Sequence, residues 1–148
     1  MTTNDGAQQG LVQRMQQTAD SLPWPVVFSK QLPGLQSGKL SPGPTPADGD
    51  DANPDQPYSW SYPMWVLLPQ GITAGEVKSA LNQNWRTQNF QVSERESGTV
   101  TAADREGYVF GAQTSAQGYL SLSIESPCFP KSQLNRSFLW PDRIESDT

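Results

Sequence analysis

Hydrophobic residues at helical spacing mark the best-defined element of the chain. Val77, Leu81 and Trp85 follow one another at intervals of four and form an apolar stripe. Thr73 and Glu76 stand before them at the spacing of a capping box, in which each side chain satisfies a backbone N–H at the helix start. The pattern predicts an amphipathic helix that begins after Thr73 and ends near residues 87–89.

A second, narrower apolar stripe predicts a helix near the N-terminus. Four residues share its apolar face: Leu11, Met15, Ala19 and Leu22. Asn4 or Asp5 is the expected cap, and the Pro-Trp-Pro run at 23–25 ends the helix. An isolated helix of this length is marginally stable in water, so it must dock on another part of the chain. A short strand is expected at 26–28.

Alternation of apolar and polar residues after the main helix predicts several strands. The clearest period-two run is formed by Leu120, Leu122 and Ile124, which are separated by serines. Shorter alternations are expected at 90–92, 100–102 and 108–110, and a buried strand at 65–68 precedes the helix. Turns at 104–107 and 116–118 are tight, which implies antiparallel neighbours.

These elements predict an α+β fold. We expect a two-layer sandwich in which one main helix packs on a mostly antiparallel sheet of four to five strands, with an N-terminal helix in addition. Ten of the thirteen prolines lie between Pro23 and Pro69, and proline removes a backbone donor and fixes φ. The expected organisation is a helix and short extended segment at 1–32, a Pro/Gly/Asp-rich loop or linker at 33–57, the α+β core at 58–130 and a C-terminal tail at 131–148.

Composition excludes several kinds of chemistry. The chain has no histidine and one cysteine, so it cannot form a Ser-His-Asp or Cys-His triad or a histidine-ligated zinc or haem. A net charge of −5 argues against nucleic acid and anionic membranes as partners. We expect no cofactor and no metal. We also expect no transmembrane segment, because no apolar run approaches the roughly 20 residues that span a bilayer. No signal peptide is visible, so the protein is either cytoplasmic or has lost an export segment.

An aromatic segment is the main binding candidate. Tyr58, Trp60 and Tyr62 alternate with serine and proline, so an extended chain projects their rings to one side, and Trp65 follows closely. Exposed rings of this kind offer contact area at small entropic cost and suit a protein partner or the faces of sugars. The alternative is that they pack inward as the first sheet strand or fix the linker to the core.

Two acidic groups are weaker candidates. A calcium loop would use the cluster Asp48, Asp50, Asp51 and Asp55, which lacks the glycine and the final glutamate of an EF-hand and suits a solvated linker better. A carboxylate pair for glycoside hydrolysis would come from Glu94, Glu96, Asp104, Glu106 and Glu125. Turn and strand-edge positions suit ordinary solubility equally well.

Cys128 and a glycosylation sequon complete the candidates. Cys128 is expected to be buried as a small apolar residue; the alternatives are a nucleophile, which lacks a histidine to activate it, or a bond to another cysteine. Asn135-Arg136-Ser137 fits the sequon, which is a very weak signal.

Short motifs over residues 60–130 resemble small uncharacterised actinobacterial cell-envelope lipoproteins. The matching pieces are Leu68-Pro69-Gln70-Gly71, the helix to Trp85, Glu106-Gly107-Tyr108 and Ser126-Pro127-Cys128. The resemblance implies an extracytoplasmic location, no defined chemistry and a lipid anchor on the full-length protein. Such proteins typically carry a lipobox and a second cysteine that can pair with the one in "SPC"; this sequence contains neither.

These observations predict a non-enzymatic, lipoprotein-like domain of the cell envelope. We expect it to bind a protein or another envelope component through its sheet or through the aromatic segment at 58–65. Two alternatives remain: a cytoplasmic accessory or inhibitor module of the immunity or phage-related kind, and a small glycan-acting enzyme that uses carboxylates.

Overall fold

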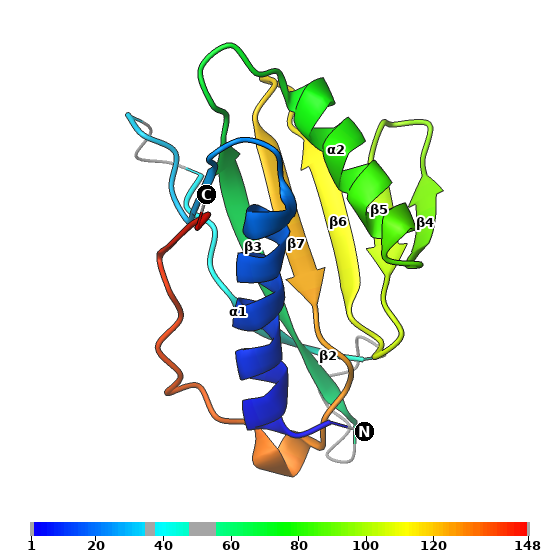
Figure 1. Ribbon diagram of the computed structural model, residues 1–148. Coiled ribbons are helices and arrows are strands. Elements are labelled where there is room, and N and C mark those ends of the chain that lie inside the picture. The colour runs from blue at the N-terminus through cyan, green and yellow to red at the C-terminus, as the bar shows by residue number, and fades with distance from the viewer. Residues whose placement is uncertain (1, 35–37, 48–55, 148) are drawn as a thin grey trace.

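The computed structural model describes residues 2–34, 38–47 and 56–147, which form two α-helices, eight strands and one 3-10 turn (Figure 1). The elements in chain order are α1 Asn4–Ser21, β1 Val27–Ser29, β2 Gly43–Pro46, β3 Tyr58–Leu67, α2 Ala74–Thr87, β4 Gln91–Glu94, β5 Val100–Ala103, β6 Val109–Thr114, β7 Leu120–Glu125, η1 Lys131–Gln133 and β8 Arg143–Glu145. The predicted α+β class is confirmed.

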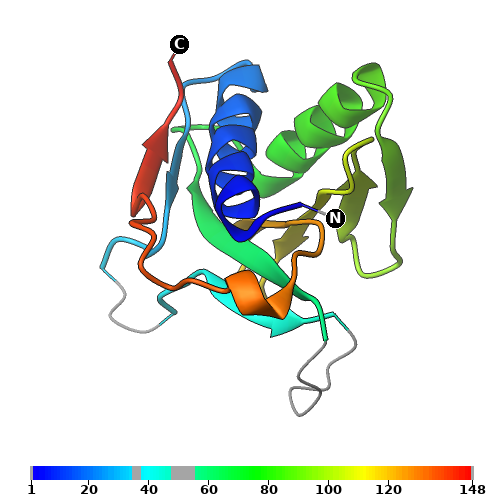
Figure 2. The ribbon, with the colours of Figure 1, turned by 90° about the horizontal axis from the view of Figure 1, so that it is seen from below.

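The eight strands form one antiparallel sheet. Seven of them follow the order β4-β5-β6-β7-β3-β1-β8, and β2 pairs with the first half of β3. The sheet curves around α1 and α2, which both lie on its concave side (Figure 2). The expected number of four to five strands is therefore wrong. The short strand expected at 26–28 forms as β1, whereas β2 and β8 are missed. They have only four and three residues, too few for alternation to be visible in the sequence.

Helix α2 is the element that the sequence predicts best. The Thr73 side chain accepts a hydrogen bond from the backbone N–H of Glu76, and the Glu76 carboxylate accepts one from that of Thr73, which completes the capping box. Val77, Leu81 and Trp85 are all buried, as predicted.

The C-terminal end of α2 is closed by a Schellman motif. The N–H of Phe90 donates to the carbonyl of Trp85, and the N–H of Asn89 donates to the carbonyl of Arg86. Asn89 has a φ of 65°, the left-handed conformation that this motif requires and that asparagine tolerates better than most residues. The motif fixes the direction of the chain as it enters β4.

Helix α1 also forms, with a different cap from the one expected. Its N-cap is Thr3, whose side chain accepts a hydrogen bond from the N–H of Gly6 at 2.9 Å. Asn4 is buried in the first turn instead, where its Oδ1 accepts a hydrogen bond from Trp60 Nε1 at 2.8 Å. The side chain of Asn4 therefore attaches the start of α1 to β3.

Three turns of the same construction connect β4 to β5, β5 to β6 and β6 to β7. In each, the backbone N–H of a glycine with φ between 85° and 91° donates to the carbonyl three residues earlier; these glycines are Gly98, Gly107 and Gly118. A three-residue hairpin loop of this kind needs its last residue in the left-handed region, which glycine adopts without steric cost. The turns predicted at 104–107 and 116–118 are confirmed.

One hydrophobic core extends along nearly the whole chain. It runs from Ala7 in α1 to Ile144 in β8 and includes Phe28 of β1. The described parts of the expected segments 1–32 and 131–148 contribute to the same core as residues 58–130. Residues 43–46 of the expected linker form β2 and pair with β3. In the described part of the chain, neither helix is long and apolar enough to cross a membrane.

Candidate functional site

The predicted aromatic segment forms the central strand β3, and three of its rings face inward. Tyr58, Trp60 and Tyr62 are at most 4% exposed. The expectation that these rings are exposed to a partner is wrong; the alternative, that they pack as a sheet strand, describes them correctly. Burial follows because even-numbered residues of β3 point toward α1 and the C-terminal segment.

The C-terminal segment covers two of these rings. The Trp140 ring lies 4.8 Å from the Tyr62 ring and 5.5 Å from the Trp60 ring, measured between centroids. The Tyr62 hydroxyl donates to the carbonyl of Pro141 at 2.7 Å. Burial, assisted by the negative charge of Asp142, raises the pKa of Tyr62 above its ordinary value, so the phenol stays a neutral donor. Residues 140–142 are therefore part of the folded domain.

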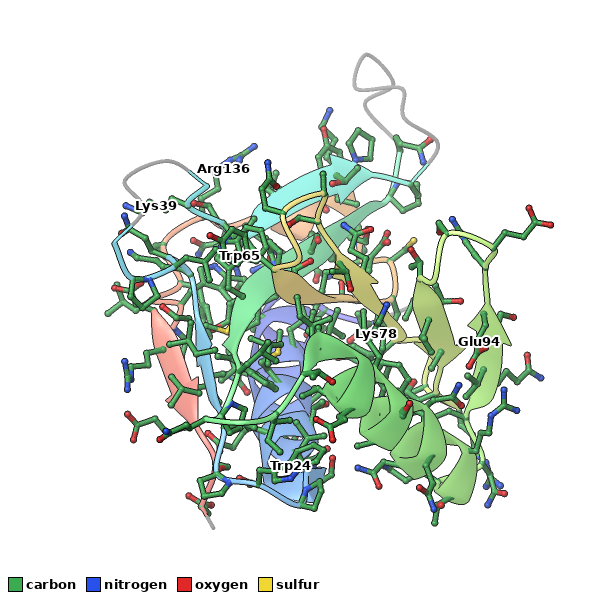
Figure 3. The ribbon with its side chains drawn as sticks, turned by 90° about the horizontal axis from the view of Figure 1, so that it is seen from above. Trp24, Lys39, Trp65, Lys78, Glu94 and Arg136 are labelled. Carbon is green, nitrogen blue, oxygen red and sulfur yellow. The ribbon has the colours of Figure 1, made fainter. Side chains whose placement is uncertain are left out.

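Trp65 lies on the opposite face of the sheet. Figure 3 shows it on the far side from Trp24, which lies on the helix side. Trp65 is half-buried: its Nε1 donates to the carbonyl of Gly38, and its ring meets Tyr119 edge-on at 6.2 Å. Of the four predicted binding residues, only Trp65 keeps an accessible ring.

The carboxylate candidates lie on several elements. Asp104 and Glu106 come together on one turn, where both bind Arg14. Glu125 accepts a hydrogen bond from Ser59 on the sheet face that carries Trp65, and Glu94 pairs with Asn82 of α2. No group of three or more potential metal ligands occurs within the described ranges. The cluster Asp48, Asp50, Asp51 and Asp55 lies outside those ranges.

Cys128 is half-buried and carries no disulfide, and its backbone carbonyl accepts a hydrogen bond from the N–H of Thr2. In the sequon, the Asn135 side chain accepts hydrogen bonds from the backbone N–H and the hydroxyl of Ser137. Neither arrangement indicates a chemical role for Cys128 or for Asn135.

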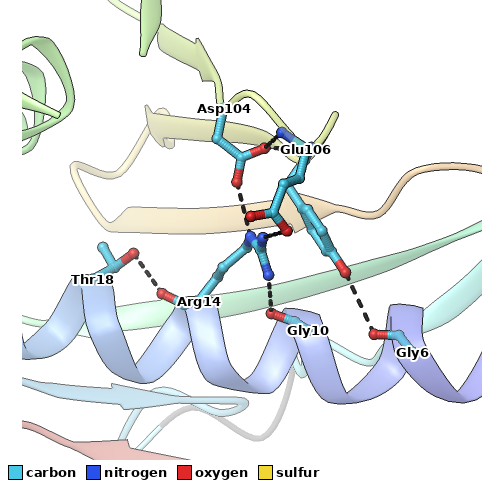
Figure 4. A network of polar contacts seen from close by, with 7 residues as sticks. Gly6, Gly10, Arg14, Thr18, Asp104 and Glu106 are labelled. Atoms are coloured by element: carbon cyan, nitrogen blue, oxygen red, sulfur yellow. Dashed lines mark hydrogen bonds and ion pairs between the residues drawn. The ribbon is translucent and has the colours of Figure 1, made fainter. Parts of the chain in front are cut away.

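Arg14 is the centre of a polar network that joins two distant parts of the chain (Figure 4). Its Nε donates to Asp104 at 2.8 Å, its Nη2 to Glu106 at 2.7 Å and its Nη1 to the carbonyl of Gly10 at 3.3 Å. Its guanidinium carbon lies 3.6 Å from the centre of the Tyr108 ring, in cation–π geometry. The network joins the middle of α1 to the β5–β6 turn.

The carboxylates hold Arg14 in its charged form. Burial by itself lowers the pKa of Arg14, but the hydrogen bond and the negative charge of Asp104 outweigh it and raise the pKa overall. Asp104 is fixed in turn, because its second oxygen accepts hydrogen bonds from the backbone N–H groups of Glu106 and Tyr108. Burial raises the pKa of Tyr108, which opposes the effect of Arg14 and leaves the ring neutral.

A pocket of about 420 Å³ opens beside this network. It is bordered by α1, by the residues that follow α2 and by the β5–β6 turn, and we call it the interhelical pocket. Its lining consists of Arg14, Gln17, Thr18, Gln88, Asn89, Phe90, Asp104, Arg105, Glu106 and Phe110. The Phe90 and Phe110 rings stack at 5.4 Å, and polar and charged side chains surround them.

The sequence contained only a partial signal for this site. Arg14 is the one basic residue of α1, and Asp104 and Glu106 stand two positions apart in a turn. Their sequence separation is 90 and 92 residues, so nothing in the local pattern links them. The sequence pattern predicts residues 88 and 89 only as the end of a helix and Phe90 only as the start of a strand.

No protein-family model matches the chain, and no curated protein or solved structure shows significant similarity to it. The interhelical pocket is therefore interpreted from its geometry and chemistry.

Proposed function

We propose that this chain is a non-enzymatic, lipoprotein-like binding domain of the cell envelope, and that the interhelical pocket holds its ligand, a small polar envelope component. The carrying observation is Arg14, which lines the pocket while Asp104, Glu106 and Tyr108 hold it rigidly. A binding group that is fixed before the ligand arrives loses little entropy on binding.

The dimensions and surroundings of the pocket support this proposal. Its volume falls within the range of about 300–1,000 Å³ that is typical of ligand pockets. Its lining combines an aromatic pair with eight polar or charged residues, which suits a polar ligand rather than an apolar one. Within the aromatic segment at 58–65, the binding candidate indicated by the sequence, Tyr58, Trp60 and Tyr62 are buried and only Trp65 keeps an accessible ring. The extracytoplasmic location is part of the proposal and draws on the resemblance of residues 60–130 to envelope lipoproteins.

A pair of glutamine variants on α1 tests the pocket. Gln17 is exposed at its rim, and Gln13 is exposed one turn earlier without lining it. We expect Gln17→Trp to fill the pocket, whereas Gln13→Trp is the matched control. A panel of amino acids, nucleosides, sugars, polyols and short peptides is screened by thermal unfolding. A ligand at ten times its Kd adds about 1.4 kcal/mol of stability, roughly 4 °C in Tm for a domain of this size.

We expect at least one class of compound to raise the Tm of the wild type and of Gln13→Trp, with no effect on Gln17→Trp. If every compound that stabilises the wild type stabilises Gln17→Trp equally, the ligand binds elsewhere and the proposed pocket function is wrong. If no compound stabilises the wild type, the proposal of a small polar ligand is contradicted.

A further inference from the structure

The interhelical pocket is balanced in charge. Arg14 and Arg105 contribute two positive charges, and Asp104 and Glu106 contribute two negative ones. The other polar lining residues are the amides Gln17, Gln88 and Asn89 and the hydroxyl of Thr18, all uncharged. The charges of the lining therefore sum to zero, and their combined field favours neither a cationic nor an anionic ligand.

The arrangement around Arg14 disfavours an anion in particular. Asp104 and Glu106 already bind this guanidinium at 2.8 and 2.7 Å, so a carboxylate or phosphate placed on Arg14 would lie beside two negative charges. A guanidinium has five N–H groups. Three of them bind Asp104, Glu106 and the Gly10 carbonyl among the described residues, which leaves two for an uncharged oxygen of a ligand.

The uncharged side chains suit a ligand that carries both donors and acceptors. The amides of Gln17 and Asn89 offer a carbonyl and an NH₂ group, and Gln88, whose NH₂ group donates one hydrogen bond to the carbonyl of Asn84, offers its carbonyl. These groups match a hydroxyl that donates one hydrogen bond and accepts others. The half-buried Phe90 ring adds an apolar surface to the same pocket. Neutral sugars combine these requirements, because they carry several hydroxyls around a ring whose C–H groups pack on aromatic side chains.

We propose that the ligand of the interhelical pocket is a neutral saccharide unit, either free or as part of an envelope polysaccharide, and that Glu106 selects against acidic sugars. This inference depends on the proposed function of the pocket and specifies its ligand. Glu106 is suited to this role because its side chain is 74% exposed at the mouth of the pocket, so an incoming acidic group meets it before it reaches Arg14.

The experiment titrates the intact chain with three probes: tetramers of a neutral hexose, of an N-acetylhexosamine and of a uronic acid, each followed by NMR chemical-shift changes. We expect the wild type to bind one of the neutral tetramers at least tenfold more tightly than the uronate tetramer. Gln17→Trp should weaken that neutral binding at least tenfold, and Gln13→Trp should leave it unchanged.

Glu106→Gln tests the selection directly, since it removes one negative charge and keeps an oxygen that can accept from Arg14. The ratio of neutral to uronate affinity should fall at least fivefold in this variant. Glu96→Gln is the matched control: it makes the same charge change in the β4–β5 turn, away from the pocket, and should leave the ratio unchanged.

The outcomes separate this inference from the proposed function. The inference is overturned if the uronate tetramer binds the wild type as tightly as the neutral tetramers do. It is also overturned if the ratio of neutral to uronate affinity is the same in Glu106→Gln as in the wild type. If no tetramer binds, while another small polar compound stabilises the wild type but not Gln17→Trp, the saccharide inference fails and the pocket function stands. Neutral binding that survives in Gln17→Trp overturns both.

Discussion

Replacing Trp140 by alanine is expected to lower the free energy of unfolding by about 3 kcal/mol, the lower end of the range for removing a large aromatic side chain from a core. Trp140 contacts the rings of Trp60, Tyr62 and Phe138 at centroid distances of 4.8–5.5 Å. Its removal exposes the outer side of these rings to water. Urea unfolding followed by far-UV circular dichroism measures the loss.

Leu139→Ala provides the matched control for this prediction. Leu139 precedes Trp140 in the same segment and is 91% exposed, so its truncation should change stability by less than about 0.5 kcal/mol. Should Trp140→Ala and Leu139→Ala prove equally mild, the C-terminal segment does not contribute to the core in solution. Near-UV circular dichroism gives a second readout, because the ring contacts of Trp60 and Tyr62 change only in Trp140→Ala.

Gly10→Ala is expected to lower the free energy of unfolding by about 2 kcal/mol, although alanine favours a helix over glycine by about 1 kcal/mol. A Cβ at residue 10 would lie 2.0 Å from the Tyr108 hydroxyl oxygen and 2.8 Å from the ring carbon that carries it. The Tyr108 ring is not free to move aside, since it is buried and lies against the Arg14 guanidinium. The overlap must therefore push α1 away from the β5–β6 turn.

Two variants check this interpretation of Gly10. Gly75→Ala makes the same change in α2, where the nearest atom to a new Cβ is 3.9 Å away, and should raise stability by about 0.5–1 kcal/mol. In the double variant Gly10→Ala/Tyr108→Phe, the hydroxyl is gone, so the combined loss measured in urea should be smaller than the sum of the two single losses. Strict additivity would show that the hydroxyl is not the cause.

The expected and observed binding residues differ because exposure depends on the partners of a strand. The alternation of Tyr58, Trp60 and Tyr62 correctly places their rings on one face of a strand. Whether that face meets water depends on α1 and on Trp140, which is 80 residues away from Trp60. The interhelical pocket also could not be predicted from local patterns, because Arg14, Phe90 and Asp104 come together only after two helices dock on the sheet.

The sequence by itself determined the elements whose signals are local. The capping box at Thr73, the stripe from Val77 to Trp85 and the glycine turns at 107 and 118 depend on hydrogen bonds and spacings within a few residues. The tertiary structure decided the rest. The strands β2 and β8 form because neighbouring strands satisfy their backbone groups. Arg14 can be largely buried because Asp104 compensates its charge. Such stabilisation comes from residues far apart in the chain, which no local pattern records.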